Sequence, residues 1–103
     1  MQTAFAALAD PTRQQIVELL AGTLELPAGR IAESFPSLTR AAVSRHLRLL
    51  EDAGLLSVRA QAQQRLYRLE PGPLAELDAW LDRYRSMWAR KVDALKRHVE
   101  DAR

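Results

Sequence analysis

The chain has 103 residues, of which 48% are hydrophobic, and it contains no cysteine. This length and composition predict a single domain over residues 1–103, and the short apolar runs exclude a transmembrane helix and a signal peptide. The lack of cysteine excludes a disulfide framework and thiolate metal sites, and it favours the cytoplasm as the location.

Basic residues are concentrated in the middle of the chain. The formal net charge is +2 and the isoelectric point is about 9.5. Residues 30–68 contain seven arginines and three acidic residues, a net charge of +4, which leaves −2 for the rest. This pattern indicates a local surface for a polyanion, although a solvated basic face would produce the same pattern.

The first third of the chain predicts three helices. Residues 2–9 are a short apolar candidate. Asp10 and Pro11 then begin a second helix, which ends at Gly22, because the carboxylate can cap free amides and proline is tolerated at the first position. A third helix is expected over residues 27–35, where the next proline stops it.

A fourth helix is predicted from Thr39, a suitable N-cap, to about residue 53, before Gly54. Its apolar residues fall at helical spacing and predict one buried face. The opposite face combines arginines with small side chains: Arg40, Ala41, Ser44, Arg45 and Arg48. Small residues allow close approach while arginines reach base edges and phosphates, so this face favours binding in a DNA major groove over a solvated surface.

Two strands are predicted next, over residues 55–60 and 64–69, because apolar and polar residues alternate there. The polar segment 61–63 has the length of a hairpin connection, and Arg59 and Arg65 lie on this ribbon. The fold class is therefore mainly α with a small β-hairpin, in the order α-α-α-α-β-β-α.

The sequence Pro71-Gly72-Pro73 is expected to break the chain before a last helix over residues 74–100. Apolar residues recur there in steps of three and four, which is a heptad-like pattern. A helix of this length would measure about 40 Å, more than a small domain needs to cover itself. Its apolar stripe therefore needs a partner, either residues 2–9 of the same chain or a second chain.

Three stretches resemble the ArsR family of winged helix-turn-helix repressors. They are Ala7-Leu8-Ala9-Asp10-Pro11-Thr12-Arg13 with Ile16-Val17-Glu18-Leu19-Leu20, Ile31-Ala32-Glu33 with Ala42-Val43-Ser44-Arg45-His46-Leu47-Arg48-Leu49-Leu50-Glu51-Asp52-Ala53-Gly54-Leu55, and Arg65-Leu66-Tyr67-Arg68-Leu69. The resemblance implies a helix-turn-helix at about 27–53 and a wing at about 55–70. It also implies a symmetric dimer, built mainly from helices 2–9 and 74–100, that binds double-stranded DNA and represses a promoter.

By position, the resemblance implies DNA contacts from the fourth helix and the wing. These are Thr39, Arg40, Ser44, Arg45, Arg48, Arg59 and Arg65, beside the small Ala41. The expected dimer interface consists of Phe5, Leu8, Leu77, Trp80, Leu81, Tyr84, Met87, Trp88, Val92 and Leu95. The aromatic residues of the last helix could instead line a pocket for a small hydrophobic effector, but their heptad spacing favours packing.

Two features depart from well-known family members. There is no cysteine, and the last helix offers only His98 beside scattered acids, which predicts the metal-free branch, with no metal and no cofactor. At the wing tip, Ala62 and glutamines replace the expected glycine and basic residues.

Other polar residues favour structural roles. His46 is expected to be packed and hydrogen-bonded. Asp78 and Asp82 are expected to pair with Arg85 and with neighbours on the side of Lys91 rather than bind a cation. No paired nucleophile and base and no phosphate-binding loop is present, so the sequence does not predict an enzyme. The alternative to a sequence-specific repressor is a winged-helix module for non-specific nucleic-acid or protein contacts, and sequence preference distinguishes the two.

Overall fold

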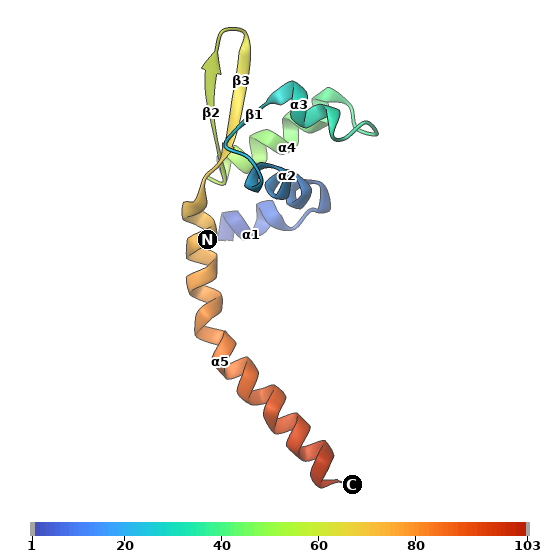
Figure 1. The fold of residues 1–103 in the computed structure, drawn as a ribbon, viewed down its shortest axis with the longest axis vertical. Helices are drawn as coiled ribbons and strands as arrows, with labels where there is room; N and C mark the ends of the chain where they lie inside the picture. The colour runs from blue at the N-terminus through green and yellow to red at the C-terminus, as the bar shows by residue number, and fades with distance from the viewer. Residues whose placement is uncertain (1, 103) are drawn as a thin grey trace.

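The computed structural model describes residues 2–102 and contains five helices and a small antiparallel sheet (Figure 1). The predicted order of elements is confirmed, with one short strand added. The elements are α1 Gln2–Leu8, α2 Pro11–Ala21, β1 Leu26–Pro27, α3 Ala28–Glu33, α4 Arg40–Asp52, β2 Leu56–Gln61, β3 Gln64–Leu69 and α5 Pro71–Asp101.

The predicted signals at helix ends work as expected. The Asp10 carboxylate accepts a hydrogen bond from the backbone N–H of Arg13 at 3.0 Å, and Pro11 follows in the first turn of α2. The Thr39 hydroxyl accepts from the backbone N–H of Ala42 at 3.0 Å, at the start of α4. These contacts satisfy amides that have no partner inside their own helices.

The third helix is shorter than predicted, because its expected first residue belongs to β1. Leu26 and Pro27 pair with Tyr67 and Leu66 of β3, so that β3 is the central strand in the order β1-β3-β2. Proline is compatible with this position because β1 is an edge strand. The prediction of helix over residues 27–35 is therefore wrong at both ends, since α3 covers only Ala28–Glu33.

The predicted break at Pro71-Gly72-Pro73 is also wrong, because these residues form the first turn of α5. The first turn of a helix has no intrahelical partners for its N–H groups, so prolines there remove nothing. The preceding residue, Glu70, donates its backbone N–H to the carbonyl of Leu55 at 2.8 Å. Helix α5 therefore begins directly at the end of the sheet.

The hairpin of β2 and β3 is regular and ends in a two-residue turn. Its register runs from Leu56 opposite Leu69 to Gln61 opposite Gln64. The first turn residue, Ala62, has a φ of 56°, a backbone conformation that favours glycine. The glutamine-rich wing tip is therefore tight despite lacking the expected glycine.

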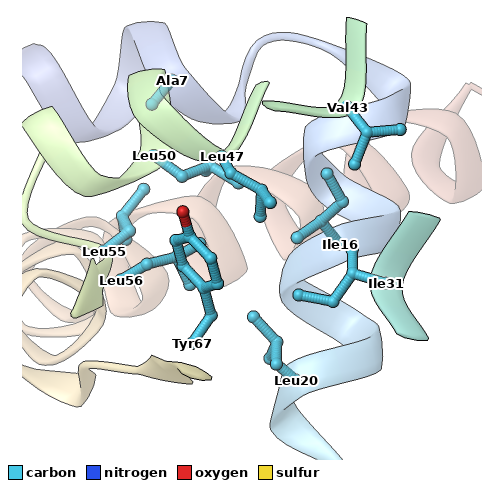
Figure 2. Close-up of a cluster of buried hydrophobic side chains, with 10 residues drawn as sticks. All are labelled: Ala7, Ile16, Leu20, Ile31, Val43, Leu47, Leu50, Leu55, Leu56 and Tyr67. Atoms are coloured by element: carbon cyan, nitrogen blue, oxygen red, sulfur yellow. The ribbon is translucent and has the colours of Figure 1, made fainter. Parts of the chain in front are cut away.

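The core lies where α2, α3 and α4 meet the base of the hairpin (Figure 2). The predicted buried face of α4 is confirmed, since Val43, Leu47 and Leu50 are at most 2% exposed. The main members of the core are Ala7, Ile16, Leu20, Ile31, Val43, Leu47, Leu50, Leu55, Leu56 and Tyr67. Burial of these side chains fixes α4 with its opposite face toward solvent.

Helix α5 extends far beyond this core (Figure 1). The molecule measures 66 × 28 × 22 Å and its radius of gyration is 18.7 Å. A compact domain of this length would have a radius of gyration of about 13 Å. Most of α5 therefore extends away from the rest of residues 2–102.

Candidate nucleic-acid interface

The predicted DNA-facing residues of α4 share one exposed face. Arg40, Ala41, Ser44, Arg45 and Arg48 are all exposed, opposite the buried face of the same helix. Within residues 2–102, none of the three arginines forms an ion pair. Three free guanidinium groups on a single helix face make a surface suited to phosphates and guanine edges.

Beside the basic N-terminal end of α4 lies a solvent-accessible hollow. Arg40 and Ser44 line a shallow hollow between α3 and α4, together with Gly29 and Ala32. Thr39, also predicted to face DNA, is exposed, but its hydroxyl oxygen accepts the capping hydrogen bond described above. Its principal contact in this structure is therefore with its own helix.

The two arginines predicted on the wing lie on opposite faces of the hairpin. Residues two apart on a strand share a face, so Arg65 shares a face with Tyr67, which is part of the core. Arg59 is paired opposite Leu66 and therefore belongs to the other face. Arg65 also lines a hollow between α3 and the wing tip, with Arg30 on the α3 side. Arg65 thus lies toward the helix-turn-helix, and Arg59 does not.

Arg59 forms an ion pair with Glu25, an acidic residue that no sequence motif had singled out. Its Nε donates to the Glu25 carboxylate at 3.0 Å and its Nη2 donates to the other oxygen at 2.5 Å. The hydrogen bonds from Arg59 hold the pKa of Glu25 below its usual value, and the charge of Arg68 adds to the effect. Such a two-point pair holds both groups in place, so Arg59 connects the wing to the loop before β1.

A second unpredicted cluster joins the turn between α1 and α2 to α4. Arg13 lies between backbone carbonyls of α1 and the imidazole of His46, whose Nδ1 is 3.3 Å from Nη1 of Arg13. The Asp10 carboxylate is 3.9 Å from the same Nδ1. The prediction that His46 is packed and hydrogen-bonded is consistent with this environment.

The predicted dimer residues form a largely exposed apolar stripe. The most exposed members of α5 are Trp88 and Leu95, at 67% and 65%. The other large apolar side chains of α1 and α5 that are exposed are Phe5, Leu81, Tyr84, Met87 and Val99. Monomeric proteins rarely expose a continuous apolar surface of this kind.

Several members of the predicted interface already pack within the chain. Leu77 is buried, Leu8 packs against the core, and Trp80 is half-buried. The ring of Trp80 contacts Phe5 edge-on, with centroids 5.4 Å apart, and Tyr84 at 5.0 Å. The apolar stripe predicted a contact between residues 2–9 and the last helix. This contact forms within one chain, near the N-terminal end of α5.

The acidic pair of α5 is used for ion pairing. Arg85 donates to Asp82 at 3.1 Å and to Asp78 at 2.5 Å, as predicted.

Among residues 2–102, no three histidine, aspartate or glutamate side chains are grouped to hold a metal ion. None of the helices in this range has the length and apolar character required to cross a membrane.

The sequence matches known regulators over most of its length. Residues 8–59 match a family model described as a helix-turn-helix domain. The chain is 44% identical over 89 residues to the HTH-type transcriptional regulator Rv2034 of Mycobacterium tuberculosis, covering 86% of this chain and 78% of that protein. It is 35% identical over 81 residues to the transcriptional repressor SdpR of Bacillus subtilis, covering 79% of this chain and 88% of that protein.

Solved structures share the fold. The ArsR family transcriptional regulator RHA00566 superposes with a TM-score of 0.78 at 27% identity, covering 85% of this chain and 94% of that chain. The homodimeric winged helix-turn-helix DNA-binding domain Mb0332 of Mycobacterium bovis has a TM-score of 0.65 at 28% identity. The match covers 79% of this chain and 73% of that chain.

Proposed function

Because the chain belongs to the ArsR family of winged helix-turn-helix transcriptional regulators, we propose that it is a homodimeric repressor that reads a palindromic operator. The family and fold are those of DNA-binding transcriptional regulators and not of enzymes. Helix α4 is the recognition helix of this proposal, and β2 and β3 form the wing. The observation that carries the proposal is the exposed face of α4 with its three unpaired arginines.

The composition of this face favours direct reading of base pairs. Arginine binds the O6 and N7 atoms of guanine through two parallel hydrogen bonds, and Arg45 lies near the middle of the exposed face. Ala41 and Ser44 are short enough to let the helix enter the groove, while Arg40 and Arg48 at its two ends neutralise phosphates. This division of roles gives both affinity and sequence preference.

The exposed stripe on α5 supports a dimer. Pairing with a second copy would cover the exposed apolar side chains between Leu81 and Val99, which lie outside the core of the protomer. The related domain Mb0332 is itself homodimeric. A two-fold axis places two copies of α4 in successive major grooves about 34–36 Å apart, and this arrangement requires a palindromic site.

Repression is the regulatory outcome that this architecture supports. The relative SdpR is a transcriptional repressor, and a dimer that occupies one face of a promoter blocks polymerase by steric exclusion. We assign the action to the cytoplasm, where the promoter is. Arg65, on the face of the wing toward α3, adds a contact with the DNA backbone beside the groove.

The proposal is tested by selecting bound DNA from a pool of random duplexes, followed by affinity measurements at several salt concentrations. We expect enrichment of one palindrome, bound by a dimer and preferred over random duplex by about a thousandfold or more. A variant with Arg40, Arg45 and Arg48 all changed to alanine should enrich nothing. Weak, steeply salt-dependent binding without enrichment would instead indicate a non-specific nucleic-acid module.

A further inference from the structure

Arg13, near the start of α2, contacts two other helices through its side chain. Its Nε donates to the carbonyl of Ala7 at 2.6 Å, and its Nη2 reaches the carbonyl of Ala6 at 3.4 Å. Its Nη1 lies 3.3 Å from Nδ1 of His46 on α4. One guanidinium therefore bridges the C-terminal end of α1 and the middle of the recognition helix.

The chemistry of each contact suits an arginine. The carbonyls at the end of α1 have no partners within that helix and carry partial negative charge, so a cation stabilises them. Because a guanidinium has only donors, a hydrogen bond between Nη1 of Arg13 and His46 requires Nδ1 of the imidazole to accept. The planar group can serve carbonyls and imidazole at once because its donors diverge in fixed directions.

We propose that Arg13 is a positioning residue, which sets the orientation of the recognition helix relative to α1 through His46. This inference rests on the proposed function, because it concerns how the DNA-reading face is aimed. His46 directly follows Arg45, the proposed base-reading residue, and is half-buried between the core and the exposed face. A change in the Arg13–His46 contact would therefore rotate Arg45 relative to the rest of the protomer.

The consequence is a link between assembly and DNA recognition. Phe5 of α1 packs against Trp80 of α5, the helix that carries the proposed dimer surface. Arg13 holds the other end of α1, so α5, α1 and α4 form a continuous chain of contacts. In a dimer paired through α5, the spacing of the two recognition helices depends on the orientation of each α4 relative to α1 and α5 of its own protomer.

The experiment compares operator affinity with affinity for random duplex in four single variants and in one double variant, which combines Arg13→Gln with His46→Leu. Arg13→Gln removes the guanidinium group, and His46→Leu removes the hydrogen-bond acceptor on α4. His46→Asn restores an acceptor, because the amide oxygen occupies the position of Nδ1. The matched control is Gln14→Ala, since Gln14 donates to the Leu8 carbonyl at 2.7 Å in the same turn but does not reach α4.

We expect Arg13→Gln and His46→Leu each to lower operator affinity about tenfold, and the double variant to lose no more than either alone, because both remove one shared contact. Affinity for random duplex and the dimerisation constant should change less than twofold. His46→Asn should bind the operator as the unchanged protein does, and Gln14→Ala should have no effect.

Two results would overturn the inference. Additive losses from Arg13→Gln and His46→Leu would show that the two side chains act independently, and equal losses on operator and random duplex would show a general effect on charge or folding. Failure of the unchanged protein to prefer any sequence would be a separate result, which contradicts the proposed function itself.

Discussion

At the scale of single residues, Arg45 provides the most direct test of the DNA-reading face. Arg45→Ala should weaken operator binding by about 1–3 kcal/mol and relax preference at one base pair, because a guanidinium that binds guanine in two-point fashion is lost. The measurement is a binding titration against operators altered at each position in turn. Arg90→Ala, an exposed arginine on α5, is the control. A loss that is uniform across sequences would make Arg45 a phosphate contact instead.

The pair formed by Glu25 and Arg59 predicts a pH-dependent contribution to stability. Its hydrogen bonds lower the pKa of Glu25 in the folded protein. A carboxylate with a lowered pKa stabilises the fold above its ordinary value near pH 4.5, and that stabilisation is lost as the pH falls through the folded value. Glu25→Gln should therefore lower the free energy of unfolding at pH 7, with the difference from the unchanged protein disappearing toward pH 3.

Urea unfolding at the two pH values measures this difference. The matched control is Glu33→Gln, because the exposed carboxylate of Glu33 lies 3.9 Å from Arg30. Its urea unfolding curves should coincide with those of the unchanged protein at both pH values. A difference for Glu25→Gln that persists unchanged at pH 3 would exclude the ion pair as its cause. The same pair occupies the Arg59 guanidinium, so the predicted DNA contact of Arg59 would compete with Glu25.

At the scale of elements, the beginning of α4 depends on the Thr39 cap. Thr39→Ala should reduce stability by about 1 kcal/mol, which lowers the melting temperature of a domain this size by roughly 4–8 °C. Thr39→Ser keeps the hydroxyl and should retain most of the stability. Thermal unfolding followed by circular dichroism measures both. Equal melting temperatures for the alanine and serine variants would contradict the capping role.

Local signals in the sequence were sufficient to predict α4. A cap at Thr39, apolar residues at helical spacing and Gly54, with a φ of 76°, define its start, buried face and end within a single turn of the real helix. The exposure of the basic face follows from the burial of the opposite one. The part of the candidate site that lies on this helix was therefore predictable from neighbours in sequence.

Features that depend on distant residues were not predictable in this way. Two-residue β1 exists because β3 lies beside it, and nothing in Leu26-Pro27 indicates a strand. The contacts of Arg13 with His46 and of Arg59 with Glu25 span 33 and 34 residues. The opposite faces of Arg59 and Arg65 follow from strand register, and the helical start at Pro71 depends on where β3 ends.

At the scale of the whole molecule, the dimer surface is tested by Trp88→Glu. A carboxylate in the middle of the apolar stripe would have to be desolvated on pairing, so the variant should be monomeric where the unchanged protein is a dimer. Ser86→Glu adds the same charge on the opposite face of α5 and should leave the dimer intact. Sedimentation in the analytical ultracentrifuge distinguishes the species. A dimeric Trp88→Glu variant would refute the assignment of this surface.

The unsupported length of α5 has a consequence for the lifetime of the protein in a cell. From Leu81 to Asp101 every side chain is exposed except Val92, which is half-buried. Most of the stability of a helix in a protein comes from tertiary packing of its apolar face, so the outer part of α5, which lacks that packing, should fray in a single protomer. Frayed segments are preferred sites of proteolysis. Unpaired chains should therefore be degraded faster than paired ones, and the half-life of the protein should rise with its own concentration.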